Sequence, residues 1–330
     1  MRKILILGGA GYVGTVLTDH LLNENYHVRS FDRFLYQNNH CVLPYLGRRG
    51  YESHYGDLCD SRTVLSSLDG ITDVVLLAGL VGDPITKKFP EISRKINEEG
   101  IQRLIELLNG RGLDRLIFVS TCSNYGLIQS DQLADEQFEL KPLSLYAKAK
   151  VAAEEKLLSM RGKTDFTPTI LRFATAFGLS PRMRFDLTVS EFTRDLALGK
   201  ELLVFDAQTW RPYCHVRDFA RLIQLILEAP KQKVANEVFN AGDEANNYTK
   251  QMIVDVISEY LPSSRVKYQE HGSDPRNYRV DFRKVREELD FAARYSVKDG
   301  VVELLAAIEA RAFDNVEKDP NIYGNYDIQS

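Results

Sequence analysis

The first fourteen residues constrain the fold more than any other part of the chain. After a basic pair, the apolar run 4–7 leads into glycines spaced as G-x-x-G-x-x-G at Gly8, Gly11 and Gly14. The first glycine of such a turn permits a tight bend, the second lets backbone approach a pyrophosphate, and the third lets a helix pack closely on the strand. The segment therefore predicts a dinucleotide-binding unit, with an ordinary strand-to-helix turn as the alternative. The predicted contacts are Gly8, Gly11, Tyr12, Val13 and Gly14.

Strands and helices are expected to alternate through the first half of the chain. Short β-branched, apolar runs are separated by longer segments in which apolar residues recur every three or four positions. This alternation predicts an α/β fold, a doubly wound parallel sheet covered by helices on both faces. The clearest strands are 3–7, 27–31, 73–77 and 115–120, and the clearest helices are 13–22 and 92–108.

The pattern changes after about residue 175. Prolines and glycines break the second half into shorter pieces, which predicts a smaller mixed α/β lobe packed on the sheet. We expect a dinucleotide-binding domain over 1–175 and the smaller lobe over 176–312, with some of its elements returning to the sheet. The segment 313–330 has no apolar period and is either a disordered tail or an arm on a neighbouring molecule. Helices of the lobe are expected at 186–198, 216–227, 250–260 and 300–311.

Composition argues against several classes of protein. The 330 residues carry 42 basic and 46 acidic side chains, a net charge of -4, which offers no positive surface for a nucleic acid. The longest apolar stretch, 74–81, is too short for a membrane span, and the N-terminal apolar run is too short for a secretory signal. Four scattered cysteines and six scattered histidines predict neither disulfides nor a metal site. We expect a cytoplasmic protein with no nucleic-acid or membrane partner.

Two carboxylates are candidates for binding the adenosine of the dinucleotide. Asp32 ends the second expected strand, near the interval at which an acid accepts hydrogen bonds from ribose hydroxyls. Its charge would repel a 2′-phosphate, which favours NAD over NADP, although Arg33 could hold that phosphate. Asp57, followed by Leu58, comes after a third strand and could accept from the adenine amino group. A turn-forming aspartate is the alternative for Asp57.

Tyr146 and Lys150 are four residues apart in a segment of strong helix formers, so they share one face of that helix. A phenol has a pKa of about 10, but a neighbouring ammonium, together with the positive charge of oxidised nicotinamide, would lower it and allow proton exchange with an alcohol. The pair is also common on ordinary amphipathic helices. The hydroxyl-rich turn at 120–126 ends a strand, where open α/β sheets bind ligands.

Taken together, the glycine turn, the hydroxyl turn and the Tyr146/Lys150 pair resemble the extended short-chain dehydrogenase/reductase superfamily, specifically its NAD-dependent nucleotide-sugar epimerase/dehydratase branch. The resemblance covers nearly the whole chain and implies a Rossmann domain, NAD as cofactor and a homodimer packed through the helix that bears Tyr146. It implies that Thr121 is the catalytic hydroxyl, Tyr146 the acid/base, and Lys150 the residue that holds the nicotinamide ribose. Further cofactor contacts implied by position are Leu77, Ala78, Gly79, Asn97 and Phe173.

The resemblance also implies where a nucleotide-diphosphate sugar would bind. The segment 210–218 is similar to the family's R-x-[YF]-x-H-V-x-D motif, so Arg211 is expected on the diphosphate. Arg276 falls where the family supplies a second arginine, whose planar fork suits phosphate oxygens. Arg182 and Arg184 are candidates for the sugar pocket, although their segment could equally be a linker. Thr175 is a candidate by position, but asparagine is usual there, so its contact does not carry over.

One departure from the family bears on the reaction. Its 4,6-dehydratases place an Asp-Glu pair after the catalytic hydroxyl, whereas this chain has Cys122 and Ser123, so water elimination lacks its proton carriers. The expected reaction is oxidation at C4 of a nucleotide-linked sugar, with Tyr146 taking the hydroxyl proton and Thr121 bonding the reacting oxygen. A 4-epimerase and a 4-dehydrogenase or 4-ketoreductase remain open, with a dehydratase less favoured. A non-catalytic NAD-binding sensor is the remaining alternative, which an intact catalytic trio disfavours.

Overall fold

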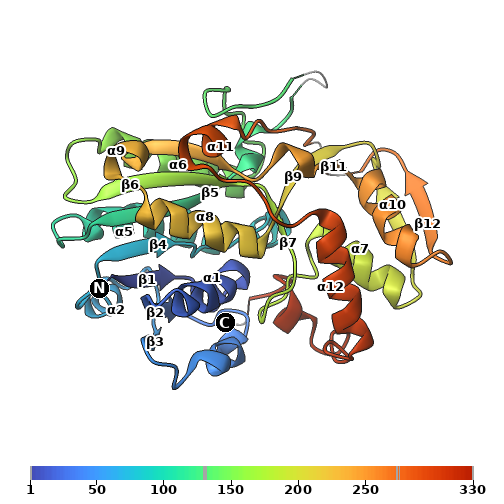
Figure 1. Ribbon diagram of the computed structural model, residues 1–330, viewed down its shortest axis with the longest axis horizontal. Helices are drawn as coiled ribbons and strands as arrows, with labels where there is room; N and C mark the ends of the chain where they lie inside the picture. The colour runs from blue at the N-terminus through green and yellow to red at the C-terminus, as the bar shows by residue number, and fades with distance from the viewer. Residues whose placement is uncertain (1, 129–131, 273, 275, 329–330) are drawn as a thin grey trace.

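The computed structural model describes residues 2–128, 132–272, 274 and 276–328, and its centre is a seven-stranded sheet (Figure 1). Every neighbouring pair of its strands is parallel, which confirms the predicted doubly wound sheet. In spatial order the strands are β10 (Glu237–Ala241), β6 (Thr167–Phe173), β5 (Arg115–Thr121), β4 (Asp73–Leu76), β1 (Lys3–Leu7), β2 (His27–Asp32) and β3 (Tyr51–Tyr55).

Helices cover both faces of the sheet. Successive side chains of a strand point to opposite faces, so each strand contributes to the apolar cluster on both sides. In β1, Ile4 and Ile6 join one apolar cluster, while Leu5 and Leu7 join the other. The first cluster lies under α1 (Tyr12–Asn23), α8 (Val216–Glu228), α9 (Lys231–Val234) and α11 (Arg283–Leu289). The second lies under α2 (Ser61–Ser66), α5 (Ile101–Leu108) and α6 (Leu145–Ser159).

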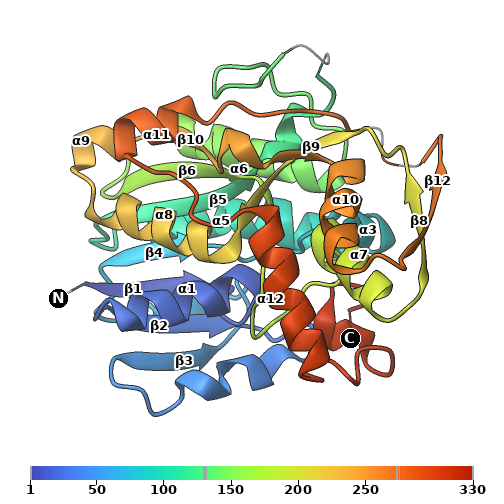
Figure 2. The same cartoon turned by 45° about the vertical axis from the view of Figure 1, so that its right-hand side comes forward.

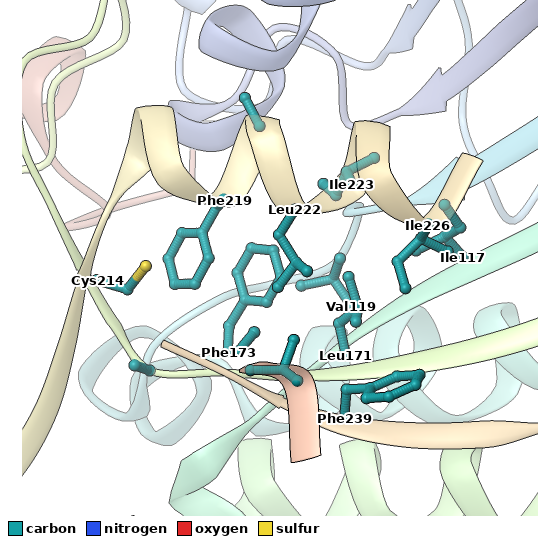
Figure 3. Packing of buried hydrophobic residues seen from close by; sticks show 14 of the residues in the cluster. Ile117, Val119, Leu171, Phe173, Cys214, Phe219, Leu222, Ile223, Ile226 and Phe239 are labelled. Atoms are coloured by element: carbon teal, nitrogen blue, oxygen red, sulfur yellow. The ribbon is translucent and has the colours of Figure 1, made fainter. Parts of the chain in front are cut away.

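Helix α8 shows how a segment from the second half of the chain completes the core of the first. Its apolar residues Phe219, Leu222 and Ile226 point toward side chains of β5 and β6, including Val119 and Leu171 (Figure 3). These residues recur at spacings of three and four, which places them on one face of the helix. Two elements after residue 175 thus belong to the main sheet and its core: β10 is one of its strands and α8 packs on one of its faces.

The expected helix over 92–108 is helical throughout, but its middle is π-helical and not α-helical. The chain forms α3 (Asp83–Lys88), α4 (Pro90–Ser93), a π-helical stretch at Arg94–Gly100, and then α5. Within the π-helical stretch, Asn97 Oδ1 accepts from the backbone N–H of Leu80 at 2.8 Å, and its Nδ2 donates to the Leu80 carbonyl at 2.9 Å. A widened helical turn of this kind is frequent at functional sites.

The smaller lobe lies off the carboxyl ends of the parallel strands (Figure 2). It contains a three-stranded and a two-stranded sheet, and its helices surround a separate apolar cluster. Helix α10 (Lys250–Tyr260) has the expected bounds. Helix α7 (Thr188–Ala197) begins later than expected, and α12 (Val297–Glu309) begins earlier, where Ser296 and Asp299 form a capping box. Its elements are β7 (Thr175–Phe177), β9 (Trp210–His215), β11 (Asn247–Thr249), β8 (Glu201–Phe205), β12 (Arg265–Gln269), α7 (Thr188–Ala197), α10 (Lys250–Tyr260) and α12 (Val297–Glu309).

The C-terminal segment is neither a disordered tail nor an arm on a neighbour up to residue 328, where the described chain ends, and both expectations for it are corrected. Its aromatic residues Phe313 and Tyr323 pack against Phe185 of the smaller lobe. The Phe185 N–H donates to the Tyr323 carbonyl at 2.7 Å, and Asn325 Nδ2 donates to the Val81 carbonyl at 2.9 Å. The segment therefore crosses its own molecule from the lobe to the loop after β4.

Candidate active site

A cleft of about 490 Å³ opens at the carboxyl ends of the strands. Strands β1 and β4 are neighbours at the point where the strand order reverses, which is where open α/β sheets bind ligands. Of the predicted site residues, Asn97 alone is outside the lining, since its side chain holds the Leu80 backbone behind it. The others that line the cleft are Gly8, Gly11, Tyr12, Val13, Gly14, Asp32, Arg33, Asp57, Leu58, Leu77, Ala78, Gly79, Thr121, Tyr146, Lys150, Phe173, Thr175, Arg182, Arg184, Arg211 and Arg276.

The glycine turn between β1 and α1 has room for no side chain at two of its positions. A Cβ on Gly8, whose φ is +90°, would lie 2.8 Å from the backbone nitrogen of Ala78. A Cβ on Gly14 would lie 2.2 Å from the Gly8 carbonyl oxygen. Helix α1 then starts after Gly11 with no side-chain cap, so its first N–H groups remain for an anionic ligand. The turn fits the pyrophosphate of a dinucleotide.

Asp32 lies at the end of β2 beside this turn. Its Oδ2 accepts from the Ala10 N–H at 3.0 Å and its Oδ1 from the Phe34 N–H at 2.8 Å. Burial raises the pKa of Asp32, and these two bonds oppose that shift. Each carboxylate oxygen has a further lone pair, so the group can also accept from ribose hydroxyls. Arg33, the alternative phosphate ligand, is paired with Asp57 at 2.8 Å.

Arg182 lies on the dinucleotide side of the cleft, where its charge acts on Asp32. Its guanidinium is 5.2 Å from the ring centre of Tyr36, and its Nη2 donates to the Gly324 carbonyl at 2.9 Å and to Asn325 Oδ1 at 3.2 Å. Burial lowers the pKa of Arg182 to about 10, helped by the positive charge of Arg184. The sequence predicts Arg182 in the sugar pocket, whereas the structure holds its guanidinium against the C-terminal segment on the dinucleotide side.

The predicted catalytic residues come together at the middle of the cleft. Ser144 caps α6 by accepting from the Ala147 N–H, which places Tyr146 in the first turn and Lys150 one turn later. Lys150 Nζ donates to the Val119 carbonyl at 2.7 Å and lies 5.8 Å from the Tyr146 ring centre. Thr121 ends β5, and its Oγ1 accepts from the Ser123 N–H at 3.1 Å.

The predicted lowering of the Tyr146 pKa is not present in the protein alone. Burial raises the pKa of Tyr146, the nearby charge of Asp83 raises it further, and the charges of Arg184 and Arg276 oppose this only in part. Burial also lowers the pKa of Lys150 to about 8. Desolvation of the phenol itself prevails over these charges, so the cofactor's positive charge, which the prediction included, would be needed to favour the phenolate.

The two arginines predicted for the diphosphate share one carboxylate. Arg211 Nη2 lies 3.1 Å from Asp274 Oδ2, and Arg276 Nη2 lies 2.7 Å from the same oxygen. Burial would raise the pKa of Asp274, but the hydrogen bonds and charge of Arg276 and the charge of Arg211 hold it well below its usual range. Arg276 Nη1 also reaches Asp83 at 2.7 Å and donates to Ser123 Oγ at 3.2 Å.

A family model described as the NAD dependent epimerase/dehydratase family matches residues 4–242. The chain belongs to this family. The match confirms the family resemblance and NAD as the family's cofactor. A dTDP-glucose 4,6-dehydratase of Streptomyces niveus is 27% identical, with 91% of each chain covered. UDP-arabinose 4-epimerase 1 of Arabidopsis thaliana is 25% identical, with 90% of this chain and 76% of that protein covered.

Solved structures of the epimerase/dehydratase family show the same fold. The dTDP-glucose 4,6-dehydratase DesIV of Streptomyces venezuelae, solved with NAD, has a TM-score of 0.85 at 22% identity over 94% of this chain and 98% of that chain. The UDP-glucuronic acid 4-epimerase of Bacillus cereus, solved with UDP-glucuronic acid and NAD, has a TM-score of 0.83 at 23% identity over 94% and 100%. The predicted Rossmann sheet with a smaller lobe is thereby confirmed.

Cys122 and Ser123 stand where the family resemblance places the Asp-Glu pair of the 4,6-dehydratases. One of the two side chains points away from the cleft and the other lines it. Cys122 is buried, and its Sγ donates to the Arg172 carbonyl at 3.1 Å, away from the cleft. Ser123 lines the cleft, where its Oγ lies 3.2 Å from the Tyr278 hydroxyl. Neither position therefore supplies a carboxylate to the substrate.

Sequence reasoning missed several residues of the cleft. Asp83 carries a weaker signal than Asp32 and Thr121, which end their own strands, because it lies seven residues beyond the end of β4. Lys250, Asp274 and Tyr278 carry no such local signal, since their segments reach the cleft only when the smaller lobe packs on the sheet.

The described residues contain neither a metal-ligand cluster nor a helix suited to a bilayer. No group of three or more histidine, cysteine, aspartate or glutamate side chains in residues 2–128, 132–272, 274 and 276–328 is arranged to hold a metal ion. Over the same part of the chain, no helix has both the length and the apolar character that crossing a bilayer requires. All four cysteines are unpaired thiols.

Proposed function

We propose that this protein oxidises C4 of a nucleotide-linked sugar with NAD, as a 4-epimerase or as a 4-dehydrogenase or 4-ketoreductase. The observation that carries the proposal is that Thr121, Tyr146 and Lys150 line one cleft with the glycine turn, while Cys122 and Ser123 bring no carboxylate. When bound, NAD supplies the oxidising power for the sugar carbon. The glycine turn and Asp32 would hold it.

The catalytic residues would each handle one proton or one hydrogen bond. Tyr146 takes the proton of the C4 hydroxyl, and Lys150, 5.8 Å from its ring centre, favours the phenolate by its charge. Thr121 Oγ1 already accepts from Ser123 N–H, so its own proton remains free to donate to the sugar oxygen. All three groups come from β5 and α6, which pack together and hold the geometry.

The diphosphate of the substrate would bind at the smaller lobe. Arg211, Arg276 and Lys250 line that end of the cleft and supply three positive charges against the carboxylate of Asp274. We propose in addition that two copies of the chain pair through α5 and α6, as the family resemblance implies. Sedimentation of the purified protein would test this, with a monomer contradicting it.

Incubation of the NAD-loaded protein with UDP-, dTDP- and GDP-linked hexoses tests the reaction. A stereoisomer without net reduced cofactor indicates an epimerase, and reduced cofactor in proportion to a keto sugar indicates a dehydrogenase. A 4-keto-6-deoxy product would contradict the argument from Cys122 and Ser123, and no turnover of any sugar would contradict the proposal.

Tyr146→Phe should lower turnover roughly 10²- to 10⁴-fold, because the proton carrier is removed, and should leave NAD bound. Turnover is followed by NMR of the sugar and NAD occupancy by absorbance of the denatured supernatant. Tyr260→Phe, on α10 and outside the cleft lining, is the matched control and should keep full turnover. Equal turnover in both variants would contradict the assignment of Tyr146.

A further inference from the structure

Asp83 is a carboxylate of the cleft that the proposed mechanism does not use. It follows Gly82 at the end of the loop after β4 and begins α3, which packs against α6. Its Oδ2 receives Arg276 Nη1 at 2.7 Å, whereas its Oδ1 is buried and has no hydrogen-bond partner in the described part of the chain. A buried carboxylate oxygen without a donor is unfavourable, so a donor from a ligand or from an ordered water would stabilise this oxygen.

The position of Asp83 places this oxygen at the sugar end of the cleft. Its charge is close enough to act on the phenol of Tyr146. Arg276, which binds it, also contacts Ser123, two residues beyond Thr121. The space beside Asp83 is therefore the space into which a sugar held by Thr121 and Tyr146 would extend.

The arginines around this space already have carboxylate partners. Arg184 makes a two-pronged pair with Asp186, with both contacts at 2.6 Å. Arg211 and Arg276 share Asp274, and Arg276 also binds Asp83. In the proposed complex Arg211 and Arg276 bind the diphosphate and Arg184 stays paired with Asp186, so none of these three guanidinium groups is left to balance a sugar carboxylate. Such a carboxylate would meet Asp83, and like charges at close range disfavour binding.

We propose that Asp83 makes this site select nucleotide sugars whose ring substituents are hydroxyl, amide or ammonium groups, and exclude hexuronic acids. Those substituents donate a hydrogen bond to Oδ1, whereas a carboxylate cannot. The proposal rests on the proposed function for the class of ligand, and it names the sugars within that class.

Binding to the NAD-loaded Tyr146→Phe protein tests the proposal without requiring turnover. Calorimetry compares UDP-glucose with UDP-glucuronate, dTDP-glucose with dTDP-glucuronate, and GDP-mannose with GDP-mannuronate. We expect the neutral member of the pair with the accepted nucleotide to bind at least roughly 10-fold more tightly. Adding Asp83→Asn, which keeps the size and removes the charge, should reduce that preference by about 10-fold. Glu91→Gln, an exposed carboxylate of α4, should leave it unchanged.

Three results would overturn the proposal: uronates that bind as well as neutral sugars, a preference unchanged by Asp83→Asn, or no binding of any of the six compounds. The preference for neutral sugars is first measured in the Tyr146→Phe protein, in which Asp83 is intact. Even if the variant that also carries Asp83→Asn folds poorly, uronates that bind the first protein as tightly as neutral sugars would overturn the proposal. If the preference is found but the wild-type protein turns over none of these sugars, the redox function fails while the role of Asp83 stands.

Discussion

Lys150 is a cation with only 3% of its surface exposed, between α6 and the end of β5. Burial lowers its pKa to about 8, below the ordinary lysine value of 10.5. Between these two values the unfolded chain binds more protons at this position than the folded protein, so the free energy of unfolding rises with pH across that window. Below that pH window Lys150 is protonated in both the folded and the unfolded state, and the full cost of burying its charge lowers the free energy of unfolding. Lys150 therefore reduces stability at neutral pH.

Lys150→Met should raise the free energy of unfolding at pH 7 by about 2 kcal/mol and abolish turnover, because it removes a buried charge that the chemistry needs. The advantage over wild type should shrink as pH rises toward 10. Urea denaturation at pH 7 and pH 10 measures the difference in the free energy of unfolding between the variant and wild type. Tyrosine titrations common to both proteins cancel in that difference. Lys148→Met, on the exposed side of the same helix, should show little change at either pH. An advantage of equal size at pH 7 and pH 10 would contradict the argument.

The turn between β1 and α1 depends on one close approach. A Cβ on Gly14 would stand 2.2 Å from the Gly8 carbonyl oxygen, although Gly14 lies within the helix, where alanine is otherwise favoured. Gly14→Ala should therefore destabilise the protein by roughly 1 to 3 kcal/mol and weaken NAD binding, since the helix must move away from the strand. Thermal unfolding and NAD titration check this. Asn23→Ala at the exposed end of α1 is the control, and a more stable Gly14→Ala protein would contradict the packing argument.

The helical segment after β4 shows where local pattern stops being sufficient. Apolar spacing predicted one helix over 92–108, and α5 does occupy its second half. The π-helical stretch before it places Asn97 so that its side chain bonds both backbone groups of Leu80. These two bonds join the helix to the loop after β4. The spacing of apolar residues within the helix does not predict them.

The C-terminal segment connects the two parts of the molecule. Tyr323 packs on Phe185 of the lobe, Asn325 bonds the loop after β4, and Asp327 pairs with Lys88 of α3 at 3.2 Å. Arg182, which lines the cleft, has Gly324 and Asn325 as acceptors in this segment. The segment therefore braces the dinucleotide side of the cleft.

Truncation after Asp319 should lower Tm by roughly 3 to 6 °C and speed the release of NAD, because Arg182 loses buried acceptors and the brace between the lobe and α3 is removed. Calorimetric scans and NAD dissociation after dilution measure these effects. Lys318→Ala, an exposed substitution just before the cut, should change neither quantity. Unchanged NAD release from the truncated protein would show that the segment only covers the lobe.

Much of the fold and of the candidate site could be predicted from neighbouring residues. The turn at Gly8 and Gly14, the helix that pairs Tyr146 with Lys150, and Asp32 at a strand end all follow from backbone geometry over a few positions. Such features are encoded locally, because steric limits and hydrogen-bond spacing act over one or two turns of the chain. The order of strands and helices follows for the same reason.

Packing determined the rest. The pairing of Asp83 with Arg276, the course of the C-terminal segment over Arg182, and the return of β10 to the main sheet each join residues far apart in sequence. These contacts depend on how the lobe, the sheet and the last helix pack against one another. The spacing of residues along the chain does not give the distance between segments that are far apart in sequence. Burial likewise sets the pKa values of Tyr146 and Lys150, since desolvation arises only once the cleft has formed.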